Sequence, residues 1–139
     1  MARLARGEAI AVPIYEFAHH ARTAHTTAVV PGRAVIIEGL FTFYWEQVRA
    51  RLAARIFVAA ADDECLARRL ERDERERGRT PESIRRQWAE TVRPMYERHV
   101  DPQRAHATLI VNGADPVAVS VAAIRAHVEP ALRAQDASA

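Results

Sequence analysis

The chain has 139 residues, of which 49% are hydrophobic and 27% are charged, and its formal net charge is +2. This composition is typical of one globular domain, and no apolar stretch is long enough to span a membrane. The N-terminus lacks the hydrophobic region of a signal peptide, and a single cysteine, Cys65, excludes an intrachain disulfide. We therefore expect a cytoplasmic protein without a membrane partner. All 20 basic residues are arginine, so the chain offers no lysine ammonium to any reaction.

The segment YEFAHHAR at residues 15–22 follows an apolar run at residues 9–14. Its aromatic, imidazole and guanidinium groups are suited to stacking on a planar base and hydrogen bonding to its edge. Aromatic side chains that simply pack in a core give the same pattern, so both interpretations stay open. The adjacent histidines do not predict a zinc site, because no cysteine or second histidine pair accompanies them at ligand spacing.

A turn expected at Pro31 and Gly32 precedes the continuous apolar run AVII at residues 34–37. Such a run predicts a strand that is buried on both faces of a parallel sheet. Glu38 follows it, and a carboxylate at the end of such a strand is suited to binding magnesium directly or through water. A helix cap or a solvated strand end is an equally good interpretation of Glu38.

The next elements alternate between helix and strand. Residues 41–54 predict a helix in which Phe43, Val48 and Leu52 are buried, and residues 56–60 predict a second buried strand. Two helices joined at a glycine follow. Either of the acids Asp62 and Asp63 is expected to cap the first helix, which ends at Gly78. Thr80 is then expected to cap a second helix that reaches about residue 100, with a kink expected at Pro94.

An arginine-rich segment, RRLERDERERGR at residues 68–79, contains six arginines and four acids. One interpretation is a solvated helix with ion pairs such as Glu71–Arg75 and Asp73–Arg77. The other is a lid at about residues 64–100, whose arginines bind a polyphosphate through paired hydrogen bonds. The lid is favoured over a nucleic-acid patch, because such a patch does not normally interleave so many acids with its arginines.

The C-terminal part repeats the alternation. Residues 107–111 predict a third strand, a helix is expected from Asp115 to about residue 133, and residues 134–139 are expected to form a frayed tail. The alternation predicts an α/β fold with a parallel sheet, in which ligands bind beyond the carboxyl ends of the strands. The polar residues expected at these ends are Glu38, Asp62 and residues 112–115.

Five motifs occur in the order found in one known family. They are PIYEFAHHAR, AVIIEGLFTFY, RIFVAAADDECLARRLERDERERGR, VRPMYERHVDP and ATLIVNGAD. On these motifs the chain, from about residue 9 to residue 132, resembles the uridine–cytidine kinase branch of the phosphoribulokinase/uridine kinase family. The combination of YxFxxHxR with RRxxRDxxERGR is the specific part of the resemblance. It implies a partial P-loop-kinase-like parallel sheet with flanking helices and a helix–Gly–helix lid.

The resemblance also implies an activity. Members of this branch transfer the γ-phosphoryl group of ATP or GTP to the 5′-hydroxyl of uridine or cytidine in pyrimidine salvage, with Mg²⁺. A homo-oligomer, by resemblance a tetramer, is implied as well, and no nucleic-acid partner. Matched by position, the substrate-binding residues are Tyr15, Phe17, His20, Arg22, Leu40, Arg69, Arg79 and Gln87. The residues matched to phosphate or nucleotide binding are Arg72, Arg77 and Asp115, and the residue matched to metal binding is Glu38.

Two catalytic parts of the family have no counterpart in the sequence. The P-loop GxxxxGK[ST] needs a lysine and two glycines at fixed spacing, whereas the five glycines stand at positions 7, 32, 39, 78 and 113. The aspartate that activates the 5′-hydroxyl is also missing, so no catalytic residue is assigned. We therefore expect residues 1–133 to be the C-terminal part of a nucleoside kinase domain, truncated at its N-terminus and inactive alone. The alternatives are a non-catalytic nucleoside-binding or oligomerisation module and, less favoured, a nucleic-acid-binding domain.

Overall fold

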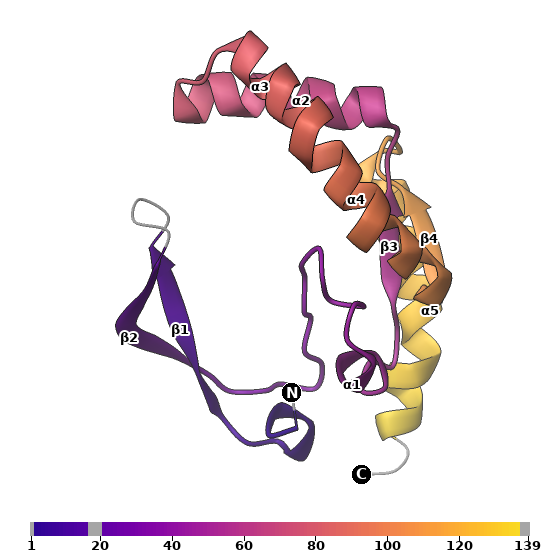
Figure 1. Cartoon of the computed structure of the whole chain (residues 1–139). Coiled ribbons are helices and arrows are strands. Elements are labelled where there is room, and N and C mark those ends of the chain that lie inside the picture. The colour runs from indigo at the N-terminus through magenta and orange to yellow at the C-terminus, as the bar shows by residue number, and fades with distance from the viewer. Residues whose placement is uncertain (1, 17–20, 137–139) are drawn as a thin grey trace. The chain divides into compact units, whose positions relative to one another are not determined.

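The computed structural model describes residues 2–16 and 21–136 of the chain. They belong to two compact units, Met1–Glu38 and Gly39–Ala139, which follow one another along the ribbon of Figure 1. None of the described helices combines the length and the apolar composition needed to cross a membrane.

The first unit is built on an antiparallel pair of strands. A short 3-10 turn, η1 (Leu4–Arg6), precedes β1 (Ile10–Glu16), which pairs with β2 (Ala21–Val29). The register shifts between Pro13 and Tyr15, because proline lacks the N–H group that a regular ladder requires. β2 includes a threonine-rich stretch for which the sequence predicts no strand. Its β-branched threonines favour extended backbone, which the polar pattern alone does not reveal.

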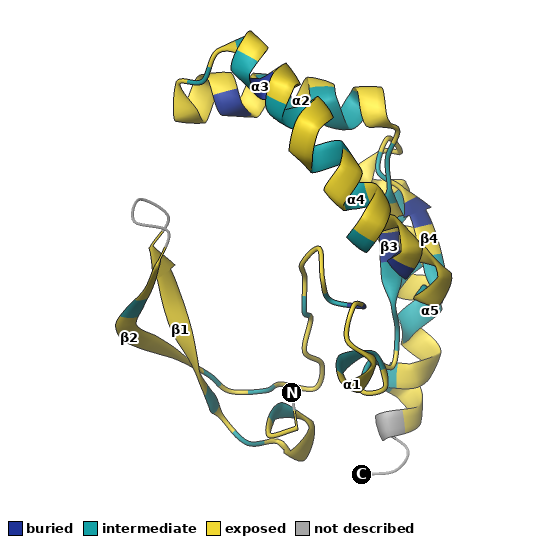
Figure 2. Ribbon diagram, in the orientation of Figure 1, coloured by how far each residue is buried: buried dark blue, intermediate teal, exposed yellow. Residues whose placement is uncertain are grey.

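The strand predicted at residues 34–37 is wrong. Residues 34–38 have no regular secondary structure, and the chain that follows β2 is mostly exposed (Figure 2). Ile36 is 93% exposed. Within the described residues, the sheets pair only β1 with β2 and the later strands β3 (Ile56–Ala59) and β4 (Leu109–Asn112) with each other. An apolar run supplies the side chains of a buried strand but not the neighbouring strands with which it must pair, and a strand without neighbours is not stable in water.

The second unit contains the parallel pair that the sequence predicts. β3 (Ile56–Ala59) lies beside β4 (Leu109–Asn112) with Ile56 opposite Leu109, and α5 (Val117–Asp136) contacts β4. The strands predicted at residues 56–60 and 107–111, and the α/β class, are therefore confirmed. The burial predicted for residues 56–60 is only partial, since Val58 is 62% exposed. The core beside this sheet consists of Phe43, Phe57 and Val100, each at most 9% exposed.

The helix predicted at residues 41–54 is much shorter than expected, since α1 spans only Glu46–Arg49. The backbone N–H of Phe43 donates to Oε1 of Gln103 at 3.0 Å, and the Phe43 carbonyl accepts from Nη1 of Arg49 at 2.7 Å. These side chains take the backbone groups that a longer helix would use itself. Phe43 is buried as predicted, and the other two predicted core positions, Val48 and Leu52, are half-buried.

The helical hairpin is our name for the segment that leaves the end of β3 and returns towards β4 (Figure 1). It consists of α2 (Asp62–Arg77), α3 (Pro81–Gln87), the π-helical turn η2 (Trp88–Val92) and α4 (Arg93–His99). The 3-10 turn η3 (Asp101–His106) then leads into β4.

Local signals set most of the ends within the helical hairpin. Gly78 ends α2 in the left-handed region at φ 58°, and the Thr80 side chain accepts the backbone N–H of Ser83, both as predicted. The predicted cap of α2 is wrong, because its N-cap residue is Ala61 and has no side-chain bond. Asp62 and Asp63 lie instead in the first turn, where negative charge is favourable beside the free N–H groups.

The break expected at Pro94 takes the form of the π-helical turn η2. The backbone N–H of Arg93 donates to the carbonyl of Trp88, five residues earlier. Pro94 has no N–H for the carbonyl one α-turn before it, and the wider π turn accommodates this loss.

Candidate phosphate and nucleoside site

The tip of the helical hairpin gathers four arginines around one buried carboxylate. Asp73 of α2 has no exposed surface. Arg72 donates two hydrogen bonds to its Oδ1 atom, from Nε at 2.9 Å and from Nη2 at 2.8 Å. Arg77 reaches the same oxygen with Nη1 at 3.1 Å. The other carboxylate oxygen, Oδ2, lies 3.4 Å from Nη1 of Arg79 and 3.6 Å from Nε of Arg69. We call these five residues the Asp73 cluster.

Helical spacing explains why these groups meet. Arg69 and Arg77 are four residues before and after Asp73, so all three lie on one face of α2. Arg79 joins from beyond the end of the helix, because the left-handed turn at Gly78 reverses the chain. The backbone N–H groups of Gly78 and Arg79 both donate to the carbonyl of Asp73, which fixes this reversal.

Gln87, the last residue of α3, links the second helix to the Asp73 cluster. Its Oε1 atom accepts hydrogen bonds from Nη2 of Arg69 at 2.9 Å and from Nη1 of Arg79 at 2.6 Å. Arg79 also donates through Nη2 to the hydroxyl of Ser83 at 3.1 Å. The structure therefore brings together five residues that the sequence assigns to the lid side of the site: Arg69, Arg72, Arg77, Arg79 and Gln87.

The arginines of the Asp73 cluster differ in exposure. The side chains of Arg69 and Arg79 are 19% and 27% exposed, whereas those of Arg72 and Arg77 are 45% and 54% exposed. Within the Asp73 cluster four positive charges share one negative charge, and the cluster faces solvent mainly through Arg72 and Arg77. Exposed guanidinium groups with unused N–H donors are well suited to binding phosphate oxygens.

The pKa directions agree with this crowding. Burial lowers the pKa of Arg69, and the charges of Arg72, Arg79 and Arg77 lower it further, against the opposing effect of Asp73. Burial alone would raise the pKa of Asp73, but the hydrogen bond from Arg72 and the surrounding positive charges bring it below its ordinary value. The carboxylate therefore stays ionised at neutral pH.

The remaining arginines of the run form the exposed ion pairs of the alternative interpretation. Arg75 pairs with Glu71 at 3.3 Å and with Glu76 at 2.8 Å, while Arg68 pairs with Glu64. The predicted pairs Glu71–Arg75 and Asp73–Arg77 both form. Of these two pairs, only Asp73–Arg77 belongs to the Asp73 cluster.

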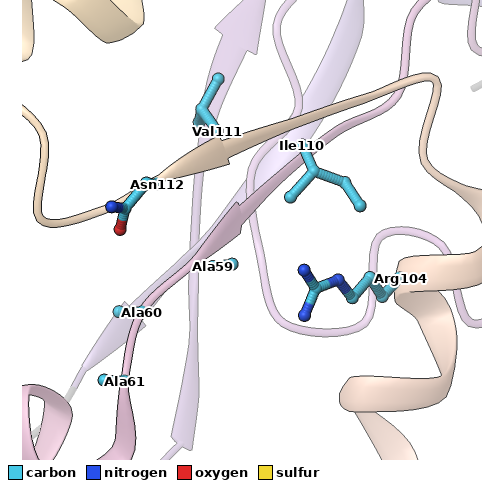
Figure 3. Close-up of a pocket in the computed structure, with 7 residues that line it drawn as sticks. All are labelled: Ala59, Ala60, Ala61, Arg104, Ile110, Val111 and Asn112. Carbon is cyan, nitrogen blue, oxygen red and sulfur yellow. The ribbon is translucent and has the colours of Figure 1, made fainter.

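A second candidate locus is a cavity of about 420 Å³ at the carboxyl ends of β3 and β4 (Figure 3). Figure 3 shows the side chains of Arg104, from η3, and Ile110 on one side of β4 and that of Val111 on the other. Sequence reasoning did not find Arg104, because its position in a short turn carries no motif. The cavity is lined by Ala59, Ala60, Ala61, Arg104, Ile110, Val111 and Asn112.

Asp115 is held beside this cavity by one of its lining residues. Nδ2 of Asn112 donates to Oδ1 of Asp115 at 3.2 Å, and Oδ1 of Asn112 accepts the N–H of Ala114 at 3.0 Å. Gly113 permits a close approach, since its N–H donates to the carbonyl of Ala59 at 2.6 Å. Asp62 and residues 113–115 thus follow strands and Asn112 ends one, so these residues lie at strand ends as predicted. Glu38 does not, because the segment before it is not a strand.

The predicted base-recognition residues are described in part. Tyr15 of β1 lies opposite Arg22 of β2, which places both side chains on the same face of the ladder. Phe17 and His20 lie outside the described residues. Leu40 is 68% exposed and follows Gly39 at the start of the second unit.

Glu38 is exposed. Within the described ranges, no three histidine, cysteine, aspartate or glutamate side chains cluster as a metal site. A single carboxylate is nevertheless a donor that fits magnesium, which is usually held by one or two carboxylates, waters and substrate phosphates.

The second unit is an α/β structure, in which an arginine-bearing helical hairpin lies in the chain between the two strands of a parallel pair. Residues 1–120 match the Phosphoribulokinase / Uridine kinase family, and the chain belongs to this family. A protein of Vibrio parahaemolyticus named uridine kinase is 36% identical over 132 residues, 95% of this chain and 62% of that protein. Uridine kinases of Vibrio cholerae and Aliivibrio fischeri are 38% and 36% identical over 94% and 95% of the chain. The chain spans 61–62% of the length of these relatives.

Proposed function

We propose that this chain carries the part of a uridine kinase that faces the nucleoside and the transferred phosphate. In the complete enzyme, the γ-phosphoryl group of ATP or GTP passes to the 5′-hydroxyl of uridine or cytidine, a step of pyrimidine salvage. The observation that carries this proposal is the Asp73 cluster, which stands on a helical hairpin in a chain that matches uridine kinases over 95% of its length. Transfer of a phosphoryl group depends mainly on positioning and on neutralising charge, and clustered arginines supply both.

The proposed roles follow the exposure of the arginines. Arg72 and Arg77 are the more exposed pair and bind phosphate oxygens, while Arg69, Arg79 and Gln87 form a hydrogen-bonded group that contacts the nucleoside. Tyr15 and Arg22, together with Phe17 and His20, bind the base, and Leu40 forms a wall of the pocket. Asp115 contacts the nucleotide side.

Magnesium is the metal that this function requires, and Glu38 is the residue that we propose as its ligand. When bound, Mg²⁺ neutralises charge on the phosphate oxygens. A homo-oligomer, by resemblance a tetramer, remains part of the proposal.

We further propose that these 139 residues do not catalyse the transfer alone. They contain no lysine and no GxxxxGK[ST] segment, so no backbone cradle is available for the β- and γ-phosphates. The chain incubated with uridine, ATP and Mg²⁺ should form no UMP. Robust formation of UMP would refute this part of the proposal and leave the phosphate site untouched.

The phosphate site is tested by calorimetric titration of the chain with inorganic tripolyphosphate at physiological ionic strength. Arg72→Ala and Arg77→Ala should each weaken binding by about tenfold, the loss of one charge-assisted contact. Arg75→Ala is the matched control, because Arg75 lies on the same helix but pairs outside the Asp73 cluster, with Glu71 and Glu76. Its affinity should change by less than about threefold. Equal losses in all three variants would indicate a nonspecific charge effect and refute the site.

A further inference from the structure

We propose that Asp73 is a positioning residue, whose buried carboxylate holds the arginines of the helical hairpin in the arrangement that binds phosphate. This inference rests on the proposed function, since it concerns the geometry of the same site. Asp73 itself is not expected to contact phosphate, because a carboxylate repels phosphate and Asp73 has no exposed surface. Its action is therefore exerted through the four arginines.

The contacts of Arg72 and Arg77 carry this inference. Arg69 and Arg79 have additional partners, because both donate to Gln87 and Arg79 also donates to Ser83. For Arg72 and Arg77, the carboxylate of Asp73 is the ion-pair partner within the described part of the chain. These are the two more exposed arginines, so the groups proposed to bind phosphate are those that depend most on Asp73.

The backbone of Asp73 contributes to the same arrangement. Its carbonyl accepts the N–H groups of Gly78 and Arg79, and its carboxylate lies 3.4 Å from the guanidinium of Arg79. The residue thus connects the end of α2 with the chain that follows it. Without a central negative charge, the guanidinium groups repel one another and lose the common point towards which they converge.

Simple electrostatics and positioning predict opposite signs for one substitution. Asp73→Asn removes a negative charge next to the phosphate site, and electrostatics alone therefore predicts tighter binding of an anion. Positioning predicts weaker binding, because the asparagine is neutral and its amide group replaces one carboxylate oxygen with a donor that arginine cannot use. The sign of the change in affinity therefore distinguishes the two explanations.

The experiment titrates the full chain with inorganic tripolyphosphate, at a temperature at which circular dichroism shows each variant to be folded. We expect Asp73→Asn to bind about tenfold more weakly. The matched control is Glu71→Gln, which makes the same change of charge on the same helix at an exposed residue paired with Arg75. Its affinity should stay within about twofold of the unmodified chain or rise slightly. If Asp73→Asn binds as tightly as Glu71→Gln or more tightly, the positioning role is refuted.

A second variant answers the question if Asp73→Asn does not fold. Asp73→Glu keeps the charge but moves the carboxylate by one methylene group, at a residue with no exposed surface. Positioning predicts an affinity about threefold lower than that of the unmodified chain, whereas an effect of charge alone predicts no change. An unchanged affinity would overturn the proposal. If the unmodified chain does not bind tripolyphosphate, the proposed function is refuted as well. If substitution of Arg72 or Arg77 weakens binding but substitution of Asp73 does not, only the positioning role is refuted.

Discussion

Replacing Gln103 by alanine should strongly destabilise the second unit. Gln103 is 5% exposed, and its amide makes three hydrogen bonds. Oε1 accepts the N–H of Phe43 at 3.0 Å, and Nε2 donates to the carbonyls of Leu40 at 2.8 Å and His99 at 2.6 Å. One side chain thus connects the turn that begins the second unit with the end of α4.

The magnitude follows from these three bonds. At about 1 kcal/mol for each hydrogen bond, Gln103→Ala should lower the free energy of unfolding by about 3 kcal/mol. With a urea m-value of about 2 kcal/mol/M, the unfolding midpoint should fall by about 1.5 M. Circular dichroism at 222 nm is a suitable probe, because all the described α-helices belong to the second unit. Gln47→Ala, at an exposed residue of α1, is the matched control and should leave the midpoint nearly unchanged.

A second substitution tests whether the bonds or the packing volume cause the effect. Gln103→Glu keeps the shape of the side chain and the acceptor for Phe43, but its carboxylate faces the two carbonyl oxygens without a donor. It should be at least as destabilising as alanine at neutral pH, and part of the loss should be recovered in acid, where a protonated carboxyl regains one donor. A loss below about 1 kcal/mol for Gln103→Ala would refute the account of how this turn is held.

Three further predictions concern local features of the fold. Gly113→Ala should lower the free energy of unfolding in urea by about 1–2 kcal/mol, because the new Cβ atom would lie 3.2 Å from the Ala59 carbonyl oxygen. Gly32→Ala should leave it almost unchanged, because no heavy atom lies within 4 Å of the new Cβ. Thr80→Ala removes the cap of α3 and should cost about 1 kcal/mol in the same assay; an unchanged midpoint would show that the cap is dispensable. Because folding lowers the pKa of Asp73, its carboxylate contributes stability at pH values above its ordinary pKa of 3.8, and this contribution is lost as the pH falls below that value. Acid unfolding below about pH 4 should therefore be less steep in a folded Asp73→Asn variant.

Features that depend on neighbours in the sequence were predictable. The two parallel strands are short apolar runs, and the turn between α2 and α3 follows from a glycine at φ 58° and a threonine cap. Each signal acts within a few residues, so no distant contact can override it easily.

Features that depend on distant contacts were not predictable. The helix expected at residues 41–54 is shortened because Gln103, 60 residues away from Phe43, takes a backbone N–H. The run at residues 34–37 has the composition of a buried strand but no strand beside it among the described residues. Periodicity describes which side chains prefer burial, whereas pairing depends on the rest of the fold.

The Asp73 cluster contains both features that neighbouring residues predict and features that depend on more distant contacts. Helical spacing predicts the pair of Asp73 with Arg77, and the same spacing would have predicted the pair with Arg69. The contribution of Arg79 depends on the chain reversal at Gly78, and that of Gln87 on the packing of α3 against α2. An aspartate within a run of alternating charges carries no sign of burial, so its central place became evident only from the structure.

The polar contacts of the helical hairpin form two sets, one at its base and one at its tip. At its base, Nη2 of Arg68 donates to the carbonyl of Gly113 at 2.8 Å, which ties α2 to the turn after β4, while Arg93 of α4 pairs with Asp62 of α2 within the hairpin. At its tip, every contact described for the Asp73 cluster lies within the hairpin itself. A rotation of the hairpin about its base would therefore break the contact of Arg68 with Gly113 and leave the arginines of the tip in place. The arrangement that we propose to bind phosphate is thus a property of the hairpin alone.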